Sequence, residues 1–509
     1  MRIKALFCAL FCPLALVTTP VPAQSFDSDA PLSAPGWLSD TITRPHANIA
    51  TTAAPQTITV MPLGQVRLDA VGILPFSTTG LPPDLWADSP PETLARLMLS
   101  QPAEGLPAML GFTQQLALAE LDPPRDAGTD AALFIARLDL LLARGALAPA
   151  RALMERAGPA DPRIFRRWFD VSLLTGQADR ACAAMRASPD IAPTFPARIF
   201  CLARSGDWPA AALSLGTGEA LGYITPDEAD LIARFLDPEL FEGDPLPPLP
   251  AEMTPLHYQM LISLGERPPS TALPLAFAHA DLSNLAGWRA QLDAAERLMR
   301  AGAIAPEEWL AIYTARVPAA SGGVWDRVAA LQAFDAALLA GDPAAITRRL
   351  PDVWAAMRQA GLEVPFATLY ADRLLRMPLT GEAAILARRV GLLSPLYEAV
   401  AQAAVAQDGP EQRLFAIARG EDPGAAPAGS ATAAVAVATA FADTTPPERF
   451  TRLLNLGRTG EALLRAARTL GNGGGDMDDM ADALRLFRAL GLEDTARRAA
   501  LQIMILERG

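Results

Sequence analysis

The sequence predicts an all-α protein, an α-solenoid of helical hairpin repeats with a small N-terminal β-hairpin segment. From residue 92 onward, apolar residues recur every three or four positions, and Ala, Leu and Arg, which are good helix formers, dominate. A glycine followed five residues later by an alanine recurs within these helical patterns, at Gly145/Ala150, Gly176/Ala181, Gly206/Ala211, Gly457/Ala462 and Gly491/Ala496. The glycines are 31, 30 and 34 residues apart within their two groups, which is the period of a helix-turn-helix repeat.

Each match describes one helical hairpin. Gly145 can end a helix in a left-handed conformation, and Ala150 then lies where the second helix meets the first. A small side chain at that point lets the two backbones approach. Met154 and Ala157 continue the apolar face of the second helix.

These offsets resemble the tetratricopeptide repeat, whose mid-repeat glycine, following alanine and later large–small pair are spaced similarly. The five matched units cover about a third of the chain, and most aromatic positions of the family's first helix are absent. Residues 226–420 hold either divergent repeats or unrelated helices. The resemblance implies a right-handed superhelix whose concave groove takes up a peptide or helix of a partner, but it identifies no groove residues here.

The N-terminus predicts a secretory signal peptide over residues 1–23. Arg2 and Lys4 form a basic start, residues 5–17 are apolar, and residues 21–23 fit a small-residue cleavage site. The apolar stretch is too short to span a bilayer comfortably. We therefore expect an exported, periplasmic protein that is soluble after cleavage.

Two alternating stretches follow the leader. Residues 57–60 place Ile58 and Val60 on one face, and residues 65–70 alternate in the same way. This pattern predicts a β-hairpin. A lone hairpin is marginally stable in water, so it either docks on the helices or pairs with another chain.

Composition divides the rest of the chain into five segments. They are a Pro/Ser/Thr-rich leader at 24–56, a β-hairpin and Pro-rich connection at 57–91, a helical-repeat solenoid at 92–420, a linker at 421–430, and C-terminal helical repeats or a cap at 431–509.

Charge and hydropathy exclude several classes of partner. The net charge is −13, and removal of the signal peptide lowers it to −15 because Arg2 and Lys4 are lost. A net acidic chain is a poor candidate for binding nucleic acid or anionic lipid. No later segment reaches the length of a transmembrane helix, and the best candidate, residues 431–442, is better explained as a buried, closely packed helix.

The sequence gives no support for catalysis, a cofactor or a metal. Its three histidines, His46, His257 and His279, lack partners at metal-ligand spacing. There is no nucleophile elbow, and the absence of lysine after Lys4 excludes the usual phosphate-binding loop. The acidic stretch at 471–480 fits a calcium loop only in part, and a flexible loop before an acid-rich helix start explains it better.

Two cysteines remain after signal cleavage, Cys182 and Cys201. They fall in consecutive expected helices, where antiparallel pairing can bring them to disulfide distance in an oxidising compartment. The alternative is a pair of small buried thiols. Either role is structural.

One loop is a candidate partner-binding site. Residues 317–323 link two expected helices and are flanked by Tyr313, Arg316, Trp325 and Arg327. Aromatic residues and arginine are enriched at binding hot spots. The alternative is that the tryptophans belong to the helical core.

We therefore expect a non-enzymatic exported scaffold that binds partner proteins in a bacterial envelope assembly. As a whole the chain also resembles bacterial periplasmic accessory proteins, including some needed for flagellar rotation. An acidic face favours basic segments of partner proteins. The alternative is a helical accessory module or regulator in cell-wall remodelling.

Overall fold

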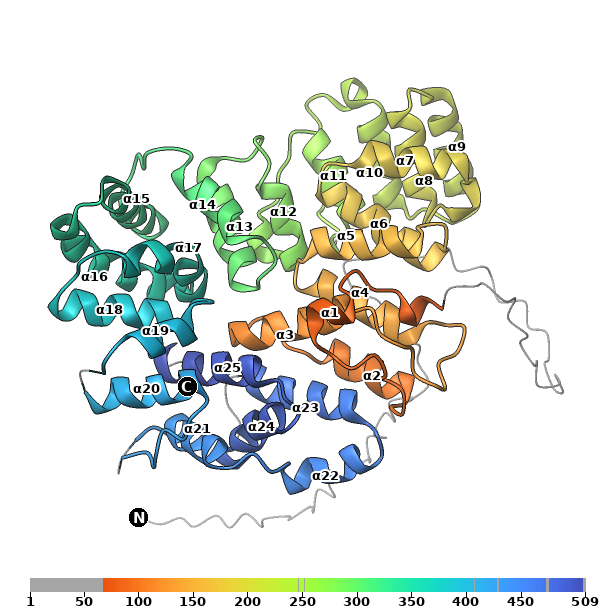
Figure 1. Cartoon of the computed structure of the whole chain (residues 1–509). Helices are drawn as coiled ribbons and strands as arrows, with labels where there is room; N and C mark the ends of the chain where they lie inside the picture. Colours follow the sequence, from red (N-terminus) through yellow and green to blue (C-terminus); the bar gives the residue numbers. More distant parts are fainter. Residues whose placement is uncertain are drawn as a thin grey trace, which may run out of the picture. The chain divides into compact units, whose positions relative to one another are not determined.

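The computed structural model describes residues 67–245, 247–250, 252–406, 408–427, 430–472 and 476–506. These residues form 25 α-helices and no strand, with a single parallel bridge between Leu74 and Ala119. They belong to one compact unit, residues 34–509. The all-α part of the prediction is confirmed (Figure 1).

The first helices are tied together by two buried arginines. Arg137 donates to the carbonyl oxygens of Ala117 and Ala119, each at 2.8 Å, and Arg144 donates to Pro102 and Leu110. Burial lowers the pKa of both arginines to about 10, which leaves them charged at neutral pH. The elements are η1 (Leu68–Ala70), α1 (Phe76–Thr79), α2 (Pro91–Leu99), α3 (Pro107–Leu118), α4 (Ala132–Ala143) and α5 (Leu147–Ala157).

The next six helices form a group whose last member returns to its first, because α11 packs against α6. The elements are α6 (Pro162–Leu174), α7 (Ala178–Ala187), η2 (Pro189–Ile191), α8 (Phe195–Arg204), α9 (Trp208–Ala220), α10 (Pro226–Leu236), η3 (Pro238–Phe241) and α11 (Pro255–Ser263). Threonine side chains start several of them. Thr194 accepts a hydrogen bond from Ala197 N at 3.1 Å, and Thr254 accepts one from His257 N at 3.2 Å.

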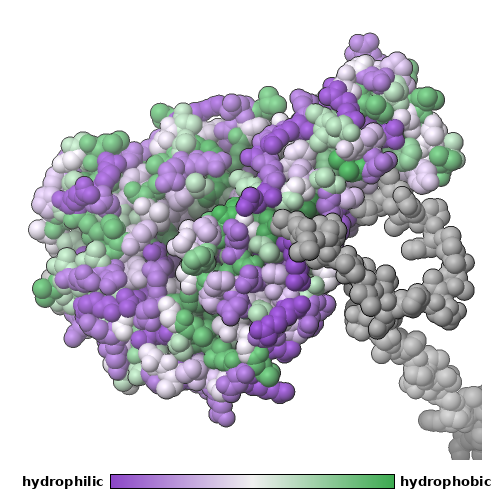
Figure 2. Space-filling view, turned by 45° about the vertical axis from the view of Figure 1, so that its right-hand side comes forward, coloured by the Kyte–Doolittle hydropathy of each residue, from purple (hydrophilic) through white to green (hydrophobic). Residues whose placement is uncertain are grey.

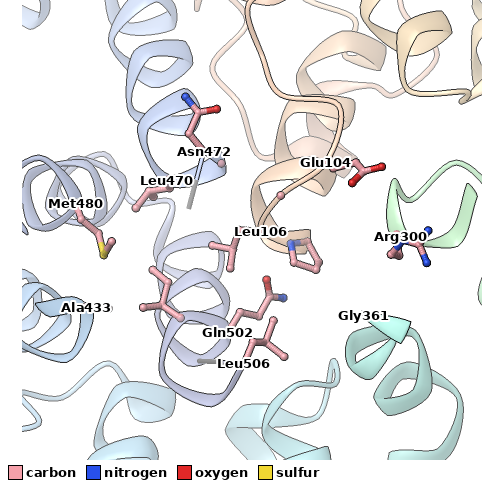
Figure 3. A pocket seen from close by; sticks show the side chains of 14 residues that line it. Glu104, Leu106, Arg300, Gly361, Ala433, Leu470, Asn472, Met480, Gln502 and Leu506 are labelled. Atoms are coloured by element: carbon pink, nitrogen blue, oxygen red, sulfur yellow. The ribbon is translucent and has the colours of Figure 1, made fainter. Parts of the chain in front are cut away.

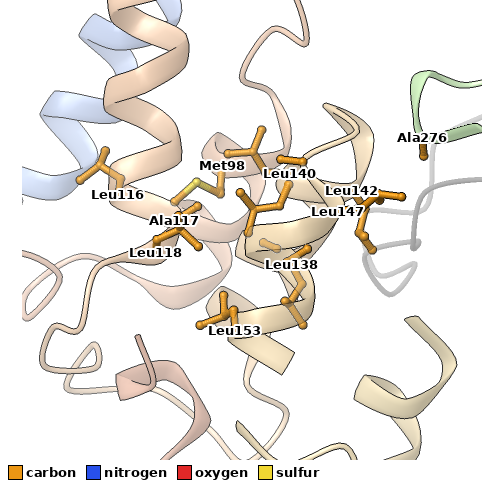
Figure 4. Packing of buried hydrophobic residues seen from close by; sticks show 14 of the residues in the cluster. Met98, Leu116, Ala117, Leu118, Leu138, Leu140, Leu142, Leu147, Leu153 and Ala276 are labelled. Carbon is orange, nitrogen blue, oxygen red and sulfur yellow. The ribbon is translucent and has the colours of Figure 1, made fainter. Parts of the chain in front are cut away.

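The central helices build a hydrophobic core of their own, which includes Leu331, Phe334 and Phe366, each 0% exposed. The elements are η4 (Ser270–Ala272), η5 (Leu275–Phe277), α12 (Ala278–Asp281), α13 (Trp288–Arg300), α14 (Pro306–Thr314), α15 (Val324–Ala340), α16 (Pro343–Ala360), α17 (Glu363–Leu375) and α18 (Gly381–Leu392). The other helices contribute mainly to a second, larger core (Figure 4). Leu375 and Ile505 pack against both cores.

The C-terminal helices return to the beginning of the chain. Helix α23 packs against α2 and α3, and α25 packs against α3, so in Figure 1 the blue helices lie beside the orange ones. Within this group α21 buries Ala436, Val437 and Phe441. The elements are α19 (Tyr397–Ala403), α20 (Gly409–Arg419), α21 (Thr432–Ala442), α22 (Glu448–Asn455), α23 (Thr459–Gly471), α24 (Met477–Ala489) and α25 (Glu493–Leu506).

The glycine–alanine prediction is confirmed at all five positions. Each glycine lies between two antiparallel helices and has a positive φ of 70° to 84°. Each alanine five residues later is 0% exposed. At Gly145 a third helix, α13, also comes close, because an added Cβ would lie 3.0 Å from a Leu298 methyl group.

The predicted β-hairpin lies largely outside the described residues, which begin at Arg67. Its last three residues, Leu68–Ala70, form the 3-10 helix η1. The expected signal peptide and leader also lie outside the described residues, and these three expectations stay predictions. In the described part of the linker, residues 421–427 and 430, there is no helix.

Candidate functional site

Two of the four residues predicted at a partner-binding loop belong to the interior. Tyr313 is 0% exposed, and its hydroxyl donates to a Glu296 carboxylate oxygen. Arg327 donates to the same carboxylate through Nε at 2.8 Å and Nη2 at 2.7 Å. Burial raises the pKa of Tyr313, so the hydroxyl keeps its proton as a donor. Both side chains therefore help to hold α13, α14 and α15 together.

The other two residues differ from each other. Trp325 is half-buried and its ring lies 5.2 Å from that of Trp288, between centroids. Arg316 is exposed, and its backbone carbonyl accepts a hydrogen bond from Gln332 Nε2 at 2.7 Å. Val317, beside it, is 82% exposed. Of the four predicted residues, Arg316 alone presents its side chain outward, and its role in binding stays a prediction.

The structure joins Cys182 of α7 to Cys201 of α8 by a disulfide, with their Cα atoms 5.0 Å apart. Each cysteine is 3% exposed. The bridge ties the second repeat hairpin to the third, which is the structural role expected of it.

The two histidines in the described residues have separate structural surroundings. His279 Nε2 lies 2.6 Å from the carbonyl oxygen of Gly145, and burial lowers the pKa of this imidazole. His257 Nε2 lies 3.3 Å from Glu228. Asp478 and Asp479 lie in the first turn of α24, as expected of an acid-rich helix start. In the part of the chain described, no cluster of three or more His, Cys, Asp or Glu side chains could hold a metal.

A cavity of about 430 Å³ opens where helices from the beginning, middle and end of the chain meet (Figure 3). Its wall is mainly apolar. The apolar contacts come from α3 and the turn before it, from α21, and from α23 to α25, through Leu106, Pro107, Ala433, Leu470, Met480 and Leu506.

A second cavity of about 320 Å³ adjoins the first, because both are lined by Pro107, Arg300 and Gly361. It continues along α3 toward α13, α14 and α17, past Leu110 and Val364. We name the two cavities together the seam groove, since one wall belongs to each hydrophobic core. Volumes of this size are typical of binding sites.

Few polar groups reach the seam groove. Gln502 is 5% exposed, and its Oε1 accepts a hydrogen bond from Ala108 N at 2.8 Å, which satisfies the start of α3. The same side chain makes no other hydrogen bond to a described residue. Arg300 donates to Ala360 O at 3.3 Å, and Glu104 stands at the edge of the same cavity. The groove thus offers apolar surface with a few polar groups at its rim.

The sequence could not predict the seam groove, because its walls come from segments hundreds of residues apart. Nothing in the local pattern around Leu106, Arg300 or Gln502 differs from that of ordinary helices and helix ends.

No helix among the described residues is long and apolar enough to cross a bilayer. Comparison with known proteins finds no matching family model, no matching curated protein and no matching solved structure.

Proposed function

We propose that this protein is a non-enzymatic exported scaffold, which holds a segment of a partner protein in the seam groove as part of a bacterial envelope assembly. The flagellar motor is one candidate assembly. The observation that supports a binding role is the apolar seam groove itself, built between two separately packed cores. Export rests on the N-terminal sequence pattern.

The shape and chemistry of the groove favour a peptide segment as its occupant. Its two adjoining cavities suit successive apolar side chains of one chain better than one compact molecule. Gln502 Nε2 and Arg300 are donors that can meet the carbonyl groups of such a segment. Binding in a preformed groove spares much of the entropic cost of ordering a loose site.

The test is capture of partners from the periplasm with the full mature chain, after gentle crosslinking and identification by mass spectrometry. The informative variant is Ala433→Arg. Ala433 is a half-buried residue of α21 that lines the first cavity, so the substitution puts a long charged side chain into that cavity. Its matched control is Ala336→Arg on the exposed side of α15.

We expect the native chain and Ala336→Arg to capture components of one envelope machine, and Ala433→Arg to lose them while melting at nearly the same temperature. Equal capture by both variants would overturn the groove as the binding site. Recovery of wall glycan fragments alone would favour the cell-wall alternative instead.

A further inference from the structure

The chain's negative charge is concentrated in one segment far from the seam groove in sequence. Residues 205–252, which we name the acidic segment, carry ten Asp or Glu and a single arginine. Their net charge of −9 accounts for most of the −13 of the whole chain. The segment spans α9, α10 and η3.

The one cation of the acidic segment is turned inward. The Arg234 guanidinium lies 4.7 Å from the centre of the Phe241 ring, and its Nε lies 3.2 Å from Asp230. Five exposed acids make no ion pair with a described residue, namely Glu219, Asp227, Glu239, Glu242 and Asp244. The outward charge of this surface is therefore uncompensated and acidic.

Exposed apolar side chains gather in the same segment. Six of the twelve large hydrophobic residues exposed in the described chain lie within it, namely Trp208, Leu213, Leu221, Tyr223, Leu240 and Leu249. Single exposed leucines are ordinary. On α9, however, Leu213 and the C-cap residue Leu221 are about two helical turns apart and so lie toward the same side of the helix. In Figure 2 hydrophobic residues lie among hydrophilic ones over this region, at the upper right.

Helix α9 explains how this surface arises. It buries only Ala211 and Gly218, and it packs closely only on its neighbours α8 and α10. The inner face is made of small residues because space there is tight: a Cβ on Gly218 would lie 2.5 Å from an Ile224 side-chain carbon. The larger apolar side chains are left outside, with Leu213 74% exposed.

We infer that the acidic segment docks a basic amphipathic helix of a partner protein along α9. The leucine face of such a helix would cover Leu213 and its apolar neighbours, while its lysine and arginine residues would face the unpaired acids. Nucleic acid and anionic lipid are disfavoured by the same charges, because their phosphates would be repelled. This surface acts independently of the seam groove.

The probe is a labelled peptide of about 18 residues with leucines at helical spacing and lysines elsewhere, and its counterpart with glutamate in place of every lysine. Binding to the full mature chain is followed by fluorescence anisotropy at two salt concentrations. We expect the lysine peptide to bind at least about tenfold more tightly than the glutamate peptide, and more weakly as salt rises.

Matched variants locate the site. Leu213→Ser with Leu240→Ser removes two of the exposed side chains, whereas Leu285→Ser with Leu339→Ser removes two of similar exposure outside every proposed binding site. We expect the first pair to weaken lysine-peptide binding by about tenfold or more and the second to leave it unchanged. Asp227→Lys with Glu239→Lys should weaken it likewise. Melting curves confirm that each variant folds.

Equal weakening by both serine pairs, or equal binding of the two peptides, would overturn the inference. Sedimentation of the chain alone tests whether a second copy of this chain is the occupant. Dimers that form with the native chain and disappear in the Leu213→Ser, Leu240→Ser variant would show that a second copy covers α9. That result would also overturn the inference. Ala433→Arg keeps the outcomes separate. This variant should lose capture of the seam-groove partner but still bind the lysine peptide. Failure of the seam-groove proposal and failure of this inference therefore give different results.

Discussion

At the scale of single residues, buried ionic groups do structural work in this protein. Glu296 is 5% exposed and accepts hydrogen bonds from both Tyr313 and Arg327. A carboxylate removed from water in this way depends on its partners, because an unpaired buried charge is strongly destabilising. The three residues come from α13, α14 and α15, so the cluster fixes three successive helices.

This cluster makes a prediction about Arg327. The variant Arg327→Ala should lower the free energy of unfolding by about 3 kcal/mol, because the buried Glu296 carboxylate loses its two hydrogen bonds from Arg327 and keeps only the more distant cation Arg300, at 3.9 Å. Urea titration measures the change. The control is Arg316→Ala on the neighbouring loop, which should stay within about 0.5 kcal/mol of the native chain. Equal stability of the two variants would contradict the structural role of Arg327.

The sequence showed that arginines and aromatic residues gather around residues 317–323, but it could not show which of them face inward. The deciding partner, Glu296, lies on α13 and looks like any acid on the polar side of a helix. A local pattern gives residue types and spacing, and the direction of a side chain depends on what the fold brings opposite it.

His279 makes stability depend on pH. Burial lowers the pKa of its imidazole below 6.5, its ordinary value, so the unfolded chain takes up a proton at a higher pH than the folded one. His279 therefore stabilises the fold least at acid pH: its contribution is intact above pH 6.5 and is lost as the pH falls toward the folded pKa. Urea midpoints from pH 8 to pH 5 should fall more steeply for the native chain than for His279→Gln. Parallel curves would contradict this.

At the scale of helices, the glycine–alanine signature identified true hairpins because it follows from geometry. In each case the alanine is the fourth residue of the second helix, and all five alanines are fully buried. For the central helices, residues 226–420, the sequence left open whether they are divergent repeats or unrelated helices, and there is a physical reason for this. The fifth residues after Gly341 and Gly361 are Ile346 and Phe366, each 0% exposed. The position is buried there too, but it holds a larger side chain, so a search for alanine does not find it.

The close packing around Ala150 can be tested by replacing its side chain with a larger one. Ala150→Leu should lower the free energy of unfolding by about 1–3 kcal/mol, because the extra atoms have no room between α4 and α5. The same substitution two residues later, Ala152→Leu, lies on the exposed face of the same helix and should have little effect. Thermal melts of both variants measure the difference. A neutral Ala150→Leu would mean that the hairpin can open at this point.

At the scale of the whole molecule, the feature that the sequence could not predict is the return of the C-terminal helices to the N-terminal ones. Gln101 Nε2 donates to Leu464 O at 2.9 Å, and the rings of Phe112 and Phe487 meet edge to face at 4.9 Å. Residues 431–509 were expected to be further repeats or a cap, and their glycine–alanine hairpins pack on α2 and α3. Periodicity describes neighbours along the chain and carries no information about contacts between its ends. The seam groove depends on this return, and was missed for the same reason.

Gly460 is the point at which this closure can be tested. Its backbone N–H donates to Leu85 O at 3.1 Å, and a Cβ there would lie 2.4 Å from the ring of Trp86, which is 0% exposed. Gly460→Ala therefore forces α23 away from the segment that leads into α2. The matched control is Gly216→Ala in α9, where an added Cβ meets nothing within 4 Å and should stabilise the helix by about 0.5–1 kcal/mol.

Hydrogen exchange followed by mass spectrometry distinguishes closure from local damage. In Gly460→Ala we expect faster exchange in α2 and α3 together with α23 and α25, because the two ends protect each other across their shared core. Helices α15 to α17, which pack in the other core, should exchange as in the native chain. Faster exchange confined to α23 would mean that the ends fold independently. The seam groove would then lack the fixed wall that its proposed function requires.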